Sequence, residues 1–196
     1  MHKNAIRLFL AGCLLASVAI VPAQANSILL SSPVVTQIGP SDWEYTYTAT
    51  LTSNSSIGGG LPSFFTIFDF VGLLPASVTE TLGAGWASTQ PNTGTVAFLQ
   101  APPDNAAVPN LVFTYTGTQI NGEVVLGTVT AHSVYGPGAN GVYNGQDFRT
   151  TDQTVQGNIG LIPESFPNDR NVPEPLTLLS CGAGLLALGL FRRNRV

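Results

Sequence analysis

The segment DWEYTYTATLT, residues 42–52, alternates apolar and polar side chains at every position. Its apolar members are Trp43, Tyr45, Tyr47, Ala49 and Leu51, and its polar members are Asp42, Glu44, Thr46, Thr48, Thr50 and Thr52. Successive side chains of a β-strand point to opposite faces of the sheet. The segment therefore predicts a strand with one buried aromatic face and one face in solvent.

The rest of residues 26–172 also favours strands. Phe64-Phe-Thr-Ile-Phe-Asp-Phe70 is apolar on both faces and predicts a central strand. Further candidates are 77–82, 94–100, 111–118, 123–135 and 146–162, and the last two allow division. Turn signals lie at 53–60, 102–105, 121–122, 136–141 and 144–145. About seven to nine short strands at this spacing predict an all-β fold, an antiparallel β-sandwich of the Ig-like or jelly-roll-like kind.

The composition limits the classes of function. Charged residues make up 9% of the chain, against about 25% in a typical soluble protein. Residues 26–172 carry Arg149 and Arg170 as their bases and contain no lysine and no cysteine. A nucleic-acid binder needs a basic face, so that class is excluded. Without disulfides, the aromatic core must supply the stability.

Residues 1–25 have the layout of a secretory signal peptide. Lys3 and Arg7 precede an apolar run, 8–21, and the small residues Ala23 and Ala25 mark a signal-peptidase site. This predicts a signal helix, export by the Sec machinery and cleavage after Ala25. The alternatives are a membrane anchor, for which the run is short, and a lipoprotein box ending at Cys13, after which the chain stays apolar.

Residues 173–196 combine three elements in order. These are Pro173-Glu174-Pro175, an apolar run of 16 residues (176–191), and a cluster of Arg192, Arg193 and Arg195. As a helix the run spans about 24 Å, short of the roughly 30 Å hydrocarbon layer. The arginines should stay cytoplasmic, and the prolines make an extended handle outside that a protease can bind. The sequence predicts a short transmembrane helix with transient membrane insertion; the alternative is a plain tail anchor.

This tail resembles a PEP-CTERM sorting signal. Proteins of that family are exported by Gram-negative bacteria that make exopolysaccharide, and exosortase, a membrane cysteine protease, cuts their tails. The resemblance covers residues 173–196 and implies exosortase as a partner. It also implies a location at the cell surface or outside the cell after processing. The same tail occurs on proteins of many kinds, some of them ice-binding, so it indicates a route and not an activity.

Few side chains suggest catalysis. His132 is the one histidine of residues 26–172, and no nucleophile motif surrounds it, so a hydrogen-bonded or exposed strand histidine is the better interpretation. A glycosidase needs two carboxylates. The candidates are Asp42 or Glu44, Asp69, Glu80, Glu123, Asp147 and Asp152. Asp69 stands out because Phe68 and Phe70 flank it. We predict no catalytic residues, no cofactor and no enzyme.

Three binding hypotheses also follow from the residues. Calcium needs hard oxygen ligands, which Asp104-Asn105 and Asp147 with Asp152 supply, but the loop spacing of a calcium motif is missing. A zinc site needs more than one histidine, so we predict no metal. Threonine arrays, as on ice-binding surfaces, are suggested by Thr46–Thr52 and by Thr114, Thr116 and Thr118. Trp86 or Tyr143 would stack on sugar rings if it lay in a loop, but packing in the core is the default expectation for each.

The sequence thus predicts three parts: signal peptide 1–25, exported β-sandwich 26–172, and sorting signal 173–196. The predicted function is that of a non-enzymatic surface or extracellular-matrix protein, associated with exopolysaccharide or biofilm. The main alternative is a carbohydrate-binding or adhesive module. An ice-binding protein and a glycoside hydrolase are the further alternatives.

Overall fold

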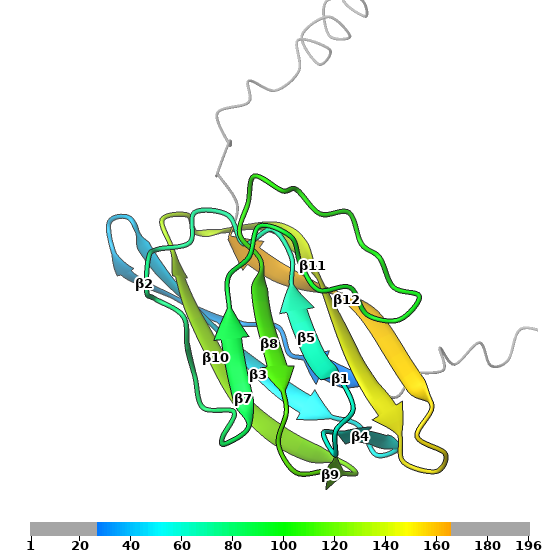
Figure 1. The fold of residues 1–196 in the computed structure, drawn as a ribbon. Helices are drawn as coiled ribbons and strands as arrows, with labels where there is room; N and C mark the ends of the chain where they lie inside the picture. The colour runs from blue at the N-terminus through cyan, green and yellow to red at the C-terminus, as the bar shows by residue number, and fades with distance from the viewer. Residues whose placement is uncertain (1–26, 166–196) are drawn as a thin grey trace, which may run out of the picture.

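The computed structural model describes residues 27–165, which form twelve strands in two antiparallel sheets and no helix (Figure 1). The all-β prediction is confirmed for this part of the chain. The signal helix and the apolar helix at 176–191 lie outside the described residues, as do the domain boundaries after 25 and 172. Within residues 27–165, no helix is long and apolar enough to span a membrane.

The first sheet is built around β3, the strand predicted at 42–52. β10 pairs with one edge of β3 along its length, with Thr46 opposite Thr130, and β6 pairs with the far edge of β10. β1 and β2 share the other edge of β3. The strands are β1 (Ile28–Leu30), β2 (Val34–Gly39), β3 (Asp42–Leu51), β6 (Thr79–Glu80) and β10 (Val124–Ser133).

The second sheet is built around β11. β12 pairs with one edge of β11, and β5 and β4 follow each other along the other edge. β8 and β7 extend the sheet beyond β5, and β9 pairs with β4. The strands are β4 (Ser55–Ile57), β5 (Ser63–Ile67), β7 (Trp86–Thr89), β8 (Leu111–Tyr115), β9 (Ile120–Asn121), β11 (Pro137–Arg149) and β12 (Val155–Ser165).

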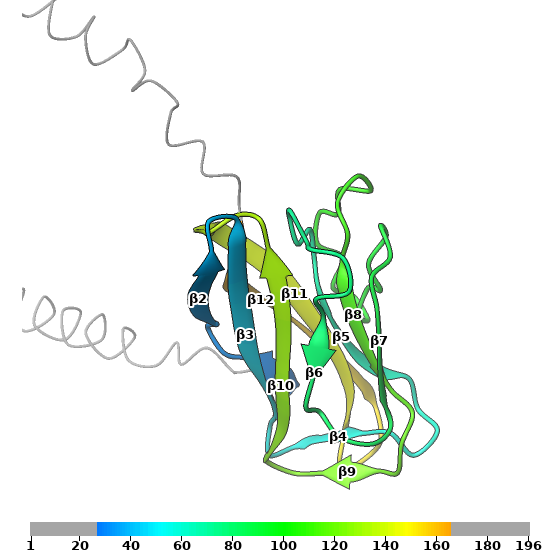
Figure 2. The same ribbon diagram turned by 90° about the vertical axis from the view of Figure 1, so that its left-hand side faces the viewer.

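The aromatic core lies between the two sheets, which face each other in Figure 2. Tyr45, Tyr47, Ala49 and Leu51 are fully buried, which confirms the register predicted for this strand, while Trp43 is partly buried at its end. From the opposite sheet, the rings of Phe65 and Phe113 stack at a centroid distance of 4.8 Å. Every residue of β5 is buried, as expected for a central strand.

The strand predicted at 94–100 is wrong. That segment is a loop with one isolated bridge, between Ala97 and Gln100. Polar side chains on the outer face of β11 hold its backbone: Gln146 Oε1 accepts from Phe98 N at 3.0 Å, and Asn144 Nδ2 donates to Gln100 O at 3.2 Å. This loop, and not a further strand, covers the outer face of β5. Thr66 Oγ1 of β5 donates to Thr95 O of the loop at 2.9 Å.

Two predicted turns, 136–141 and 144–145, are also wrong, because β11 runs through both. The glycines there allow close packing. A Cβ on Gly145 would lie 2.7 Å from Asn158 Oδ1 of the neighbouring strand. The 146–162 candidate is divided by a turn at 150–154, whereas 123–135 is one strand with a bulge between Val125 and Gly127. The structure has twelve strands within residues 27–165, more than the seven to nine predicted. Strands of two or three residues are too short to show a detectable alternation.

Candidate functional site

The outer face of the first sheet carries an array of threonines that we call the threonine face. It consists of Thr46, Thr48 and Thr50 of β3, Thr128 and Thr130 of β10, Thr79 of β6, and Thr81 just after β6. The members on β3 alternate with the buried core residues, so their side chains point away from the core. Strand pairing places Thr46 and Thr48 opposite Thr130 and Thr128.

The threonine hydroxyls form regular rows across the strands. The Oγ1 atoms of Thr46 and Thr130 lie 3.0 Å apart, and those of Thr81 and Thr128 lie 2.9 Å apart. Within a strand the rows repeat about every 6.8 Å, and between strands about every 4.8 Å. These bonds fix the hydroxyls of two rows, which makes the face an ordered polar surface without formal charge.

Part of the threonine prediction is corrected. Thr52 lies beyond β3, where its Oγ1 accepts from Ser27 N at 2.8 Å and bonds to Ser55 Oγ at 2.8 Å. Thr116 and Thr118 follow the end of β8 at Tyr115, so only Thr114 of that group lies in a strand. The sequence missed the real partners of the β3 threonines, because strand order cannot be read from a single strand.

Exposed valines flank the threonine rows. Val34 of β2 pairs with Thr46 and is 69% exposed, and Val125 of β10 pairs with Thr50 and is 64% exposed. Threonine also carries a methyl group, so this face offers methyl groups beside its hydroxyls. Such a surface suits ligands that have both hydroxyl groups and apolar edges.

His132 lies at one end of the threonine face, between two carboxylates. Its Nδ1 lies 2.9 Å from Asp42 Oδ1, and its Nε2 lies 3.4 Å from Glu44 Oε2. Ser77 Oγ accepts from the backbone N of His132 at 3.2 Å. This serine therefore bonds to the backbone and not to the ring. The arrangement confirms a hydrogen-bonded strand histidine.

Asp69 and Asp104 are structural acceptors in the loops beside β5 and β8. Asp69, at a φ of 55°, accepts from Asn105 N through Oδ1 at 2.9 Å. Asp104 Oδ2 accepts from Gly94 N at 2.8 Å, and its Oδ1 accepts from Asn110 Nδ2 at 3.1 Å. Asn110 Oδ1 in turn accepts from Asp69 N at 2.8 Å. These bonds hold the loop that covers the second sheet.

The other candidate acids are scattered. Glu80 accepts from Leu82 N, and Glu123 is exposed. Asp152 lies in the exposed β11–β12 turn, where hydrogen bonds from Thr154 and then the charge of Arg149, 3.3 Å away, lower its pKa. Asp147 is fully buried, so it and Asp152 do not form the calcium site considered from the sequence. Residues 27–165 contain no group of three or more histidine, cysteine or acidic side chains that could hold a metal ion.

Glu164 is a buried acid that sequence reasoning missed. Its side chain is 1% exposed, and burial, followed by the charge of Asp69, raises its pKa to about 9. The burial of Tyr45 and Tyr47, followed by the charge of Glu164, raises the pKa of both phenols. The signal was present: Asn158, Ile162 and Glu164 share the inward parity of β12. Glu164 is therefore neutral near pH 7.

Neither aromatic proposed for sugar stacking is available for it. Trp86 lies in β7, with its ring 5.1 Å from Tyr115 and 5.5 Å from Phe65. Tyr143 lies in β11 and is buried. Tyr143 packs in the core and Trp86 packs against it, which confirms the default expectation, and the alternative of a loop placement is wrong.

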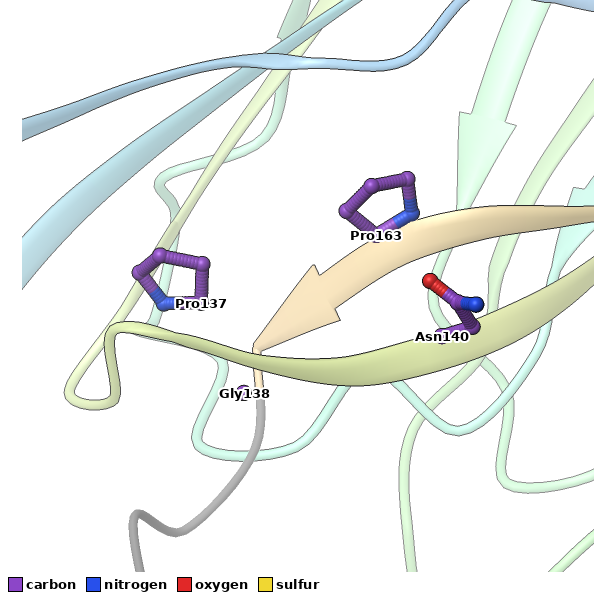
Figure 3. A pocket seen from close by; sticks show the side chains of 4 residues that line it. All are labelled: Pro137, Gly138, Asn140 and Pro163. Carbon is purple, nitrogen blue, oxygen red and sulfur yellow. The ribbon is translucent and has the colours of Figure 1, made fainter.

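One pocket of about 380 Å³ opens where β11 begins and β12 ends. Pro137, Gly138, Asn140 and Pro163 line it (Figure 3). Asn140 and Pro163 are paired across the two strands, and their side chains point to the same side. The lining residues within 27–165 are two prolines, a glycine and an asparagine, which offer apolar rings and one side-chain amide.

The residues of the two predicted addresses lie outside the described part of the chain. They are Ala23 and Ala25 of the signal-peptidase site and Pro173, Glu174, Pro175, Arg192, Arg193 and Arg195 of the sorting signal.

Comparison with known proteins gives no family. No family model matches the sequence, and no curated protein matches it. Two solved structures of a GH20 exo-β-N-acetylglucosaminidase from Vibrio harveyi are similar over 71% of this chain. One is an inactive mutant and one a complex with N-acetylglucosamine; the TM-scores are 0.39 and 0.37, with 11% identity. The match spans 18% of those chains. A likeness this weak carries no argument about fold or activity.

Proposed function

We propose that the protein is an exported, non-enzymatic surface or extracellular-matrix protein whose threonine face binds exopolysaccharide. The observation that carries this proposal is the array of threonines on three adjacent strands, with cross-strand hydroxyl pairs at 2.9 and 3.0 Å. A hydroxyl both donates and accepts a hydrogen bond. An ordered set of them therefore complements the hydroxyl groups of a polysaccharide.

The charge distribution supports the same proposal. The formal net charge of the chain is −4. The threonine rows themselves contain no acid or base. His132, Asp42 and Glu44 lie together at one end, where a charged substituent of a sugar would meet them. We propose that the two-sheet scaffold is Ig-like or jelly-roll-like, since both architectures present binding surfaces of this kind.

The proposed route uses both addresses. The signal peptide directs export, and exosortase removes the tail after Pro173-Glu174-Pro175, which releases the protein to the cell surface or the biofilm matrix. The resemblance of residues 173–196 to a PEP-CTERM signal supports this route.

The non-enzymatic part of the proposal rests on how the candidate acids are used. Asp69 and Asp104 accept hydrogen bonds from the loop backbone, and Asp42 is bonded to His132. Carboxylates held in this way are not poised as the acid and nucleophile of a glycosidase.

Ice binding is a second candidate function, favoured by the regular rows of threonine hydroxyl and methyl groups. It makes a different prediction from polysaccharide binding, because the ligand is the water lattice itself. Thermal hysteresis of the exported protein, lost in Thr48→Arg, would support it. Polysaccharide binding without thermal hysteresis would reject it.

The test of the main proposal is a co-sedimentation of the exported protein with the polysaccharide of its own host. We expect saturable binding and no release of reducing ends. Turnover that is lost in Asp69→Asn, or in another single carboxylate variant, would overturn the non-enzymatic proposal. Absence of binding would overturn the polysaccharide proposal.

A further inference from the structure

β12 (Val155–Ser165) is a long and regular strand at an edge of the second sheet (Figure 1). Its register with β11 has no shift from Val155 to Glu164, and within residues 27–165 no strand pairs with its other edge. The other outermost strands have six residues or fewer, and β2, the longest of them, has a register shift between Gln37 and Gly39. Short strands and bulges protect an edge from pairing with another chain. β12 has neither of these protections.

The backbone groups at this free edge follow a simple alternation. Arg149 N donates to Thr154 O at 2.9 Å, so the backbone of Thr154 is directed toward β11. In an antiparallel strand, successive residues direct their N–H and C=O groups to opposite edges. The next residue and every second one after it therefore direct these groups away from β11. They are Val155, Gly157, Ile159 and Leu161. Pro163 ends the series, because it has no N–H and its C=O accepts from Tyr47 Oη at 3.2 Å.

The side chains at the same positions form an apolar strip on the outer face of β12. Leu161 is 69% exposed, and Val155 and Ile159 are also exposed. The one acid of β12, Glu164, is buried, so the exposed residues of the strand carry no charge. The formal net charge of the chain is −4. This strip is therefore a place where a second copy meets no like charge at the contact.

The loop at 94–100 adds to the strip near its middle. It lies over Gly157, where a Cβ would fall 2.7 Å from Phe98 O. The neighbour of Phe98, Leu99, is 84% exposed at the tip of a turn that Gln100 N closes on Ala97 O at 3.0 Å. The loop thus leaves two large apolar side chains in solvent beside the free edge.

We propose that β12 pairs with β12 of a second copy of this chain, antiparallel and about a two-fold axis. The four outward-directed residues are complementary to themselves, with Val155 opposite Leu161 and Gly157 opposite Ile159. Each such pair exchanges two backbone hydrogen bonds. In this register Pro163 stays outside the paired segment, and the two-fold axis makes every contact occur twice.

The pairing also covers the apolar strip. Neighbouring strands lie about 4.8 Å apart, so Ile159 of one copy lies beside the loop over Gly157 of the other. Phe98 and Leu99 of that loop become its apolar neighbours. Their burial stabilises the pair, which is needed because the new backbone hydrogen bonds replace bonds to water.

The symmetry of the pair also orients the threonine face. The two-fold axis of an antiparallel strand pair is perpendicular to the sheet, so both copies keep the same face on the same side. The threonine face belongs to the first sheet and points away from the second, which contains β12. Both threonine faces therefore lie on one side of the dimer. This consequence rests on the polysaccharide binding proposed above, since a long polysaccharide would contact both faces and its second contact would be intramolecular.

Sedimentation of the native protein, in the form that its host produces, tests the dimer over a concentration series up to about 1 mM. We expect a reversible equilibrium between monomer and dimer in the absence of polysaccharide. Leu161→Lys should weaken the dimer at least about tenfold, because the two-fold interface contains the new charge twice. The matched control is Val34→Lys, which should leave the dimer intact, since Val34 is also 69% exposed but lies on β2. A monomer at every concentration, or equal weakening by both variants, would overturn the proposal.

Hydrogen exchange at single-residue resolution distinguishes strand pairing from other contacts and needs no variant. Between dilute and concentrated protein, exchange of the Ile159 and Leu161 amides should slow about tenfold when the monomer fraction falls to about a tenth. The amides of Asn158 and Gly160 are directed toward β11 and should change less. Equal changes at all four amides, or protection of β12 only after addition of host polysaccharide, would overturn the second copy as the occupant. Loss of polysaccharide binding in a protein that still dimerises would count against the function proposed above and leave this pair intact.

Discussion

The carboxyl group of Glu164 lies over Gly141, in the space where any other residue would place its side chain. A Cβ on Gly141 would fall 1.8 Å from Glu164 Cδ. Glu164 belongs to β12 and Gly141 to β11, and both face the interior between the sheets. The glycine thus creates the room that a buried acid occupies, beneath Tyr45 and Tyr47.

Glu164 should make stability fall as the pH rises. Its pKa is raised to about 9 in the folded protein from 4.5, so the folded state keeps a proton that the unfolded chain loses. Between these values stability falls with pH by up to about 1.4 kcal/mol per unit. The side chain of Glu164→Gln does not titrate. The free energy of unfolding of this variant, relative to that of the native protein, should therefore rise by about 1 kcal/mol per pH unit from pH 6 to pH 8. Urea unfolding at three pH values measures this difference; a constant difference would contradict it.

The contact between Gly141 and Glu164 predicts coupled mutations. Gly141→Ala forces the Glu164 side chain to move and should destabilise the protein by about 1–3 kcal/mol. In a Glu164→Ala background the same change should cost less, because the obstructing carboxyl is gone. A double-mutant cycle measures the coupling. Strict additivity would show that the two side chains do not compete for the space.

The core and the threonine face should respond differently to truncation. Phe65 is fully buried and stacks on Phe113, so Phe65→Ala should cost about 3–5 kcal/mol. Thr48→Ser removes one methyl group from the outer face and should stay within about 0.5 kcal/mol. Chemical denaturation compares them, and similar losses in both variants would contradict the assigned faces.

The sequence predicted β3 and β5 because their patterns are long and unambiguous: strict alternation in one, and apolar residues on both faces in the other. It failed at β11, where Gly141 and Gly145 resemble turn residues but serve to admit Glu164 and Asn158. The loop at 94–100 has the β-propensity of a strand. Its hydrogen bonds, however, go to Asn144 and Gln146, a tertiary preference that no local pattern records.

The candidate site was predictable in one half only. The alternating threonines of β3 suggested the face, but Thr128 and Thr130 were not connected with it, because pairing of β3 with β10 joins segments about eighty residues apart. Glu164 was missed although it shares the parity of Asn158 and Ile162 in β12, because that parity alone does not show which face of β12 is buried.

The predicted sorting signal should be processed in the host. Glu174→Ala, or replacement of Arg192, Arg193 and Arg195 together by Ala, should trap a longer, membrane-bound form, because the handle or its orientation is lost. Intact mass spectrometry of the extracellular and membrane fractions measures this. Native protein recovered outside the cell and still ending at Val196 would show that the tail is an anchor and not a processed signal.

The central claim is that the threonine face binds the host exopolysaccharide, and a titration of that polysaccharide with matched arginine variants tests it most directly. Thr48→Arg places a long charged side chain in the middle of the threonine face, whereas Thr118→Arg places the same side chain in the loop between β8 and β9. If the arginine blocks contacts that contribute about 1.4 kcal/mol to the binding free energy, the affinity falls tenfold. The account predicts at least about tenfold weaker binding for Thr48→Arg and native affinity for Thr118→Arg. Equal affinity of both variants and the native protein would contradict it.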